Sequence, residues 1–121
     1  MLSIFKALSD GNRLKIFVAL TNCDELCACQ ITEFLQVTGA TASRHLSILT
    51  SAGLIESRKD GRWVYYRLHR QRAAFAWLLD GIKANKELQV EMGNHLKTLK
   101  NVLACNPEDL CRKQRGESCC P

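Results

Sequence analysis

The sequence has no long apolar run and little that points to export. Its longest apolar runs, such as "IFVAL", are far too short to span a bilayer. The opening "MLSIFKAL" carries one basic residue and no long apolar stretch, which does not match a secretory signal peptide. We therefore expect a cytoplasmic protein with no membrane partner.

Histidine is scarce and does not cluster. His45, His69 and His95 are scattered, and no set of nucleophile, base and orienting residue is evident, so an enzyme is not expected. A zinc site on the C-terminal helix would need clustered Asp and His ligands. Asp80 and His95 are fifteen residues apart, which is too far for one site within a helix.

Cysteine is absent from the middle of the chain but abundant on either side of it. The seven cysteines form one group at Cys23, Cys27 and Cys29 and another at Cys105, Cys111, Cys119 and Cys120. An odd number cannot all pair within one chain, and a reducing cytosol disfavours structural disulfides. Clustered free thiols therefore indicate soft-metal binding or redox sensing.

The length and charge of the chain are those of a small basic domain. Its 121 residues correspond to one domain, and 17 Lys and Arg residues against 12 Asp and Glu residues give a net charge of +5. This surplus suggests a polyanionic partner without establishing one. Both prolines lie in the polar C-terminal end, so we expect a folded domain over residues 1–104 and a flexible, cysteine-containing tail over residues 105–121.

Apolar periodicity and capping residues predict a series of short helices before a β-hairpin. The predicted elements are a helix in "MLSIFKAL", a helix capped by Asp10, a polar connector over 21–26, a helix from Cys27 or Ala28 to Leu35, a helix over 39–52 capped by Thr38 and stopped by Gly53, and a hairpin with strands 54–59 and 62–68. The pair Asp60-Gly61 is a strong turn signal between these strands.

The region after the hairpin is predicted to be helical almost throughout, with local weakening at Gly81 and Gly93. Its apolar stripe consists of Met92, Leu96, Leu99 and Leu103. We expect this long helix and the N-terminal segment to form a dimer interface. Packing of the helix on its own domain is the alternative.

The order of these elements predicts a mainly α fold with a small β-hairpin, namely a winged helix-turn-helix with a long C-terminal dimerisation helix. The helix after the tight turn would read the major groove, and the hairpin would be a wing that reaches phosphates. The predicted DNA contacts are Thr41, Ser43, Arg44, His45, Ser47, Lys59 and Arg62. For His45, a packing role within the domain is as compatible with the sequence as a DNA contact. Arg58, also in the wing, could form an ion pair with a carboxylate instead of contacting DNA.

Several segments together resemble the arsenical-resistance repressors of the ArsR/SmtB type. They are "ALSDGNRLKIFVAL", "ELCAC", "SRHLSILTSAGLI" and "RKDGRWVYYRL", and the resemblance covers roughly residues 5–80. It implies a winged-helix homodimer that represses an operon by binding operator DNA until a thiophilic ion binds. Gly11 departs from the pattern, because the family often has proline at the first helical position.

"ELCAC" resembles the family's arsenic-binding motif, which implies Cys27 and Cys29 as ligands. Trivalent arsenic favours three thiolates, but Thr32 stands where some members have a third cysteine. Cys23 or a tail cysteine is the candidate replacement. We expect arsenite, and also antimonite, as effector, with no cofactor required. Sensing of cadmium, lead or organoarsenicals, a thiol–disulfide redox switch, and a metalloid carrier without a DNA role remain the alternatives.

Overall fold

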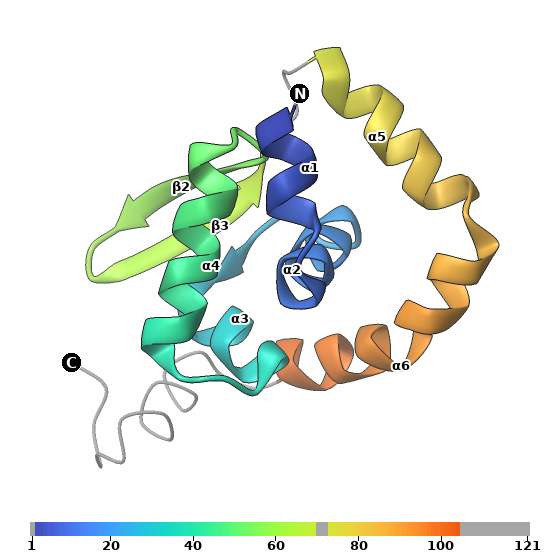
Figure 1. The fold of residues 1–121 in the computed structure, drawn as a ribbon. Coiled ribbons are helices and arrows are strands. Elements are labelled where there is room, and N and C mark those ends of the chain that lie inside the picture. Colours follow the sequence, from blue (N-terminus) through green and yellow to red (C-terminus); the bar gives the residue numbers. More distant parts are fainter. Residues whose placement is uncertain (1, 70–72, 105–121) are drawn as a thin grey trace.

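The structure is a computed structural model that describes residues 2–69 and 73–104 of the chain (Figure 1). The elements are α1 (Leu2–Leu8), α2 (Gly11–Thr21), β1 (Leu26–Cys27), α3 (Ala28–Leu35), α4 (Gly39–Ser51), β2 (Ile55–Asp60), β3 (Trp63–Leu68), α5 (Ala73–Ala84) and α6 (Lys86–Leu103). The predicted fold class is confirmed, because helices dominate and α3, α4 and the β2–β3 hairpin form a winged helix-turn-helix. The predicted tail over residues 105–121 lies outside the described residues.

Local capping explains where the first helices begin. The Asp10 side chain accepts hydrogen bonds from the backbone amides of Asn12 at 2.8 Å and Arg13 at 3.2 Å, as predicted for the N-cap of α2. The hydroxyl of Thr38 accepts from the amide of Thr41 at 3.2 Å and caps α4 in the same way. Asp10 and Thr38 therefore end the preceding segments sharply and fix the start of α2 and α4.

The turn between α3 and α4 is set by backbone conformation. Gln36, the residue after α3, has a φ of 55°, the left-handed conformation that commonly ends a helix. Gly53 has a φ of 78° after α4, as expected for its predicted role as a stop. The three residues predicted to face the core from α4, namely Ala42, Leu46 and Leu49, are all buried.

The sheet is larger than the sequence predicted. The strand order is β1-β3-β2, with Ile55 opposite Leu68 and Asp60 opposite Trp63 in the hairpin. The two-residue turn is therefore Gly61-Arg62, and the predicted turn at Asp60-Gly61 was wrong by one residue. Gly61 has a φ of 61°, which glycine adopts without a steric penalty at the first position of such a turn.

Strand β1 was not predicted, because residues 21–26 were interpreted as a polar connector. Leu26 lies opposite Tyr66 and Cys27 lies opposite Tyr65, so this short strand extends the hairpin sheet. The Leu26 side chain is fully buried. The segment that leads into α3 is therefore joined to the wing.

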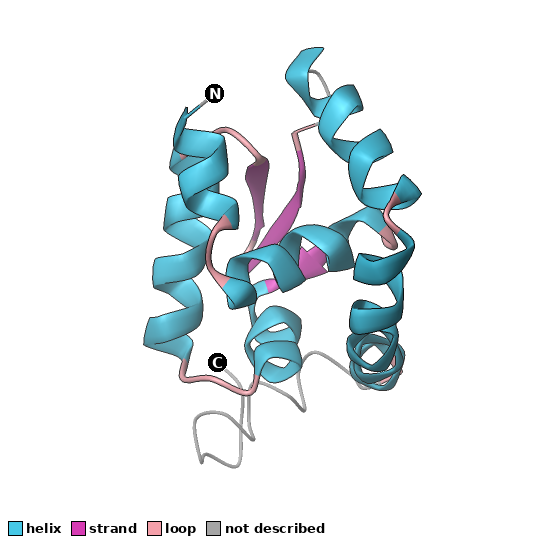
Figure 2. Ribbon diagram, turned by 45° about the vertical axis from the view of Figure 1, so that its right-hand side comes forward, coloured by secondary structure: helices cyan, strands magenta, loops and turns pink. Residues whose placement is uncertain are grey.

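The C-terminal helical region is divided in two rather than continuous. Helix α5 ends at Ala84 and α6 begins at Lys86, and neither Gly81 nor Gly93 interrupts a helix. Helix α5 lies on the opposite side of the domain from α4 (Figures 1 and 2). Leu99 and Val102 of α6 are buried in the core of the same chain.

Part of the stripe predicted to need a dimer partner is therefore covered within the chain. Helix α6 packs against α2 and α3, as the alternative interpretation proposed. Leu103 keeps 42% of its surface exposed. None of the described helices is both long and apolar enough to cross a membrane.

Candidate nucleic-acid interface and thiol site

The N-terminal part of α4 presents polar side chains to solvent. Four of the residues predicted to contact DNA are exposed, namely Thr41, Ser43, Arg44 and Ser47. They share the helix with the buried Ala42, Leu46 and Leu49, so the core holds one face of α4 and leaves the other free. This is the arrangement that allows a helix to enter a major groove.

His45 differs from its neighbours because it faces α2. Its side chain is only 12% exposed, and Nδ1 lies 3.3 Å from Nη1 of Arg13 and 4.0 Å from Oδ1 of Asp10. The structure therefore gives His45 the packing role that the sequence allowed. A DNA contact through this residue stays a prediction.

Arg13 joins three helices and was not singled out from the sequence. Its Nε donates to the carbonyl of Ala7 at 2.6 Å, and Nη2 donates to that of Lys6 at 3.5 Å. These carbonyls belong to the last turn of α1, where a cation complements the helix dipole. Through His45 the same guanidinium also contacts α4, so it helps to orient the helix that would read DNA.

The pKa of Asp10 reflects this network. Burial acts to raise it, but the hydrogen bonds from the amides of Arg13 and Asn12 and the charges of Arg13 and His45 outweigh burial and lower it. Asp10 is therefore held as a carboxylate, which is the form that caps α2.

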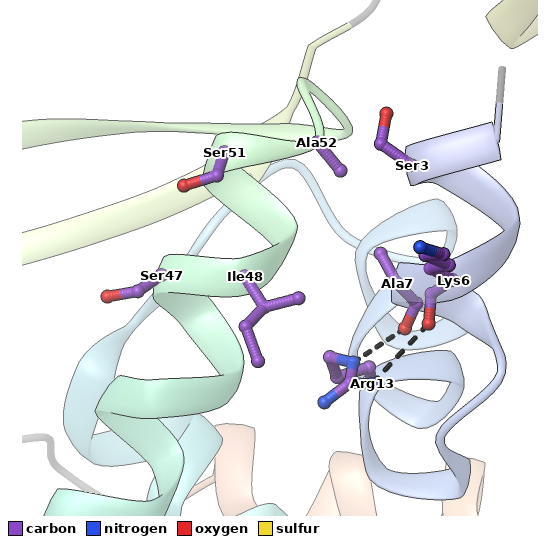
Figure 3. A pocket seen from close by; sticks show the side chains of 8 residues that line it. All are labelled: Ser3, Lys6, Ala7, Arg13, Ser47, Ile48, Ser51 and Ala52. Carbon is purple, nitrogen blue, oxygen red and sulfur yellow. Dashed lines mark hydrogen bonds between the residues drawn. The ribbon is translucent and has the colours of Figure 1, made fainter.

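A cavity of about 400 Å³ separates α1 from α4. It is lined by Ser3, Lys6, Ala7, Arg13, Ser47, Ile48, Ser51 and Ala52 (Figure 3). Figure 3 shows the Arg13 side chain on the α1 side, bonded to the carbonyls of Lys6 and Ala7. The guanidinium therefore bonds to α1 at the edge of this cavity while it also contacts His45 of α4.

The wing carries its basic residues in different environments. Lys59 is exposed, and its side chain has no ion pair or hydrogen bond among the described residues. Arg62 is exposed and lies 5.7 Å from the centre of the Trp63 ring. Both positions are compatible with the predicted phosphate contacts, which stay predictions.

Arg58 is engaged with the segment before β1. Its Nε donates to Oε2 of Glu25 at 3.0 Å, and its guanidinium lies 4.5 Å from the centre of the Tyr65 ring. The hydrogen bond from Arg58 lowers the pKa of Glu25, and the same bond raises the pKa of Arg58. The ion-pair interpretation of Arg58 is confirmed, and its partner is 33 residues away in sequence.

Cys27 occupies the junction of three elements. It is 1% exposed, forms the N-cap of α3 with extended backbone, and pairs with Tyr65 across the sheet. Its amide donates to Oε1 of Gln30 at 2.9 Å, so the first turn of α3 is tied back to it. Any displacement of Cys27 therefore acts on α3 and on the wing.

The other two N-terminal cysteines differ from Cys27 and from each other. Cys29 is disulfide-bonded, whereas Cys23 and Cys27 form no disulfide bond, so the bond of Cys29 is to neither of them. Burial, followed by the charge of Asp24, raises the pKa of Cys23 to about 11. Its Sγ donates to the carbonyl of Ala19 at 3.2 Å.

The described residues contain no group of three or more His, Cys, Asp or Glu side chains placed to hold a metal ion. Thr32, at the position of the missing third cysteine, is buried and donates its hydroxyl to the carbonyl of Ala28 at 2.8 Å. Cys105, Cys111, Cys119 and Cys120 lie outside the described residues. The ligand set of Cys27, Cys29 and Cys23 stays a prediction.

Comparison with known proteins addresses the family. Residues 10–57 match the description "Bacterial regulatory protein, arsR family". The arsenic resistance transcriptional regulator ArsR2 of Pseudomonas putida is 32% identical over 98 residues, which cover 79% of this chain and 85% of that protein. The chain belongs to the ArsR family. This is a family of regulatory proteins, in agreement with the expectation that the chain is not an enzyme.

The chain is also similar to a regulator named for cadmium resistance and to a solved winged helix-turn-helix domain. The cadmium resistance transcriptional regulatory protein CadC of Listeria innocua is 52% identical over 62 residues. That match covers 51% of this chain and 52% of CadC. The chain therefore spans about half the length of this relative. A homodimeric winged helix-turn-helix DNA-binding domain of Mycobacterium bovis has a TM-score of 0.61 and 32% identity, covering 73% of this chain and 81% of that one.

Proposed function

We propose that this ArsR-family chain is a homodimeric repressor that binds operator DNA and releases it when arsenite binds cysteine thiolates. The observation that carries the proposal is the position of Cys27 at the start of α3, the helix before α4, where it also pairs with the wing strand β3. A thiophilic ion bound there would act directly on the start of α3 and, through the backbone pairing of Cys27 with Tyr65, on β3. The exposed face of α4 and the tip of the wing supply the DNA-binding surface.

The chemistry of the thiols suits trivalent arsenic. Arsenite is a soft ion that favours thiolate ligands, and each thiol that binds gives up its proton. A thiolate of Cys27 would lie at the positive N-terminal end of α3. Cys23, with its raised pKa, remains protonated at neutral pH and would have to lose this proton and its bond to Ala19 on binding.

The names of the relatives indicate a thiophilic effector but do not decide between arsenic and cadmium. One relative is named for arsenic resistance and another for cadmium resistance. Both ions are thiophilic, so the shared chemistry supports a cysteine site. We assign arsenite because the "CAC" spacing in residues 27–29 supplies two neighbouring thiols and because no histidine or carboxylate group joins them among the described residues.

A thiol–disulfide switch is a second candidate, favoured by the disulfide bond at Cys29. Oxidation would remove one of the two thiols of the "CAC" segment, so arsenite binding requires the reduced protein. The two functions can be separated, because a redox switch releases DNA with oxidant alone and a metalloid sensor releases it with arsenite under reducing conditions.

The ion pair between Glu25 and Arg58 should take part in the response. We expect Glu25→Gln to keep operator affinity within about threefold, since a solvent-exposed ion pair contributes little to stability. The release caused by arsenite should become weaker, because the segment before Cys27 is then held less firmly to β2. The measurement is the ratio of operator dissociation constants with and without arsenite.

Glu56→Gln is the matched control for that variant. Glu56 pairs with Arg67 at 2.7 Å, which is an ion pair inside the hairpin that does not reach β1. Its arsenite response should equal that of the wild-type protein. Equal responses in the Glu25 and Glu56 variants would contradict a role for the Glu25–Arg58 pair.

Dimer formation is expected from apolar surface outside the core. Phe5 is 49% exposed on α1, Trp77 is 64% exposed on α5, and Val90 is 80% exposed on α6. Large apolar side chains that stay this exposed in one chain can be buried against a second copy of it. Sedimentation velocity at micromolar concentration should give a dimer, and a monomer that still binds a two-half-site operator would contradict the proposal.

A further inference from the structure

A groove between α4 and the wing is lined by hydroxyl groups. Its volume is about 250 Å³, and the lining residues are Ser47, Thr50, Ser51, Ser57 and Tyr66. They come from α4, β2 and β3, elements that lie beside each other in Figure 1. Ser47 was predicted to contact DNA, whereas the other four had been given no role.

Most of these hydroxyls are available to a ligand. The Thr50 hydroxyl donates to the carbonyl of Leu46 at 2.7 Å. Within the described part of the chain, Ser47, Ser51, Ser57 and Tyr66 have no side-chain hydrogen bond. A ligand that accepts several hydrogen bonds would therefore find donors from both sides of the groove.

Lys59 and the carboxylates of β2 lie on different faces of the hairpin. Successive residues of a strand point to opposite faces, so Lys59 shares a face with Ser57 and lies one step closer to the tip. Tyr66 is directly opposite Ser57 on the neighbouring strand. The carboxylates of β2, Glu56 and Asp60, lie on the other face with Arg58.

We propose that this groove holds one backbone phosphate of the operator, with Ser51, Ser57 and Tyr66 as hydrogen-bond donors and Lys59 as the nearby positive charge. The proposal rests on the proposed function and deepens its DNA surface. A phosphodiester accepts hydrogen bonds and donates none, and hydroxyl side chains are frequent partners of DNA phosphates. The groove separates the helix expected in the major groove from the wing, so a DNA strand that contacts both elements crosses it.

Burial gives Tyr66 a defined position in this groove. Tyr66 packs against the hydrophobic core, and burial raises the pKa of its phenol. The hydroxyl therefore stays protonated and can donate a hydrogen bond. Tyr65 offers a matched control, since it is the adjacent tyrosine on the opposite face, beneath Arg58. Replacing either tyrosine by phenylalanine removes one hydroxyl and keeps the ring.

The test compares Tyr66→Phe, Ser57→Ala and Tyr65→Phe with the reduced wild-type protein by fluorescence anisotropy. Tyr66→Phe and Ser57→Ala should each weaken operator binding by about three- to tenfold, as expected for a lost hydrogen bond. Both should weaken an unrelated duplex by the same factor and leave the salt dependence unchanged, because no charge is removed. Tyr65→Phe should bind like the wild-type protein.

Neutral methylphosphonate linkages, placed one at a time along the operator, then locate the phosphate. At one linkage in each half-site, the difference in affinity between the wild-type and Tyr66→Phe proteins should shrink, because a neutral linkage is a weaker hydrogen-bond acceptor than a charged phosphodiester. Wild-type affinity in both groove variants, or a deficit that keeps its full size at every neutral linkage, would overturn the proposal. Failure of the wild-type protein to bind any duplex would overturn the proposed function as well.

Discussion

Operator DNA bound by the Cys27→Ser protein is expected to stay bound at arsenite concentrations that release the wild-type protein. A serine oxygen is a much harder ligand than a thiolate, so the substitution removes a bond that arsenic favours. The fold should survive, because Cys27 is the N-cap of α3 and serine is among the preferred residues at that position. Fluorescence anisotropy of a labelled operator under reducing conditions measures both DNA binding by the variant and its release by arsenite.

The remaining thiols provide the comparisons for this variant. Cys29→Ser should also bind DNA and fail to respond, whereas Cys23→Ser should respond poorly only if Cys23 supplies the third ligand. A Cys119→Ser, Cys120→Ser double variant tests the alternative that the C-terminal cysteines supply it. If the Cys27 variant released DNA as readily as the wild-type protein, the effector site would lie elsewhere.

Arg44→Ala is expected to weaken specific operator binding by about 1–3 kcal/mol, or roughly five- to 150-fold. Arg44 is exposed on α4, between the buried Ala42 and Leu46, and its guanidinium can donate two hydrogen bonds to a base edge or a phosphate. The measurement is operator affinity at constant salt, compared with affinity for operators that carry single base substitutions. Discrimination at one base pair should be lost if the contact is to a base.

Arg67→Ala controls for the loss of one positive charge. Arg67 is also exposed but pairs with Glu56 within the hairpin. Its operator affinity should change little compared with that of Arg44→Ala. Unchanged affinity in the Arg44 variant, with the same unfolding temperature as the wild-type protein, would refute the assignment of α4 as the reading helix.

The helices were predictable from the sequence because their signals are local. Asp10 and Thr38 cap α2 and α4 through hydrogen bonds to amides within three residues, and such motifs can be recognised along the chain. Strand β1 is only two residues long, too short to show an alternating pattern, and it exists because β3 pairs with it. The turn at Gly61-Arg62 depends likewise on the pairing of Asp60 with Trp63.

The candidate site was predictable in its residue types but not in its contacts. The spacing of Cys27 and Cys29 indicated a site for a thiophilic ion. The pairing of Cys27 with Tyr65, however, depends on a strand residue that lies 38 positions later in the sequence. The partners Glu25 and Arg58 are 33 residues apart, and Arg13, the partner of His45, lies on α2. Contacts of this kind arise from tertiary packing, which capping and periodicity do not report.

The break between α5 and α6 has the same kind of cause. Gly81 and Gly93 are the weak helix formers in this region, but both are helical, and the break falls at Asn85. Leu99 and Val102 of α6 are buried in the core of the same chain. The direction of α6 therefore follows from the surface of α2 and α3 that it covers.

Titration of the reduced wild-type protein on its labelled operator tests the central claim most directly. Arsenite, antimonite, cadmium and an oxidant are added to separate samples, and the dissociation constant is measured for each. The account predicts release by arsenite and antimonite under reducing conditions, and no release by arsenite when the Cys27→Ser protein is used. Release by the oxidant or cadmium alone, with arsenite inactive, would contradict it.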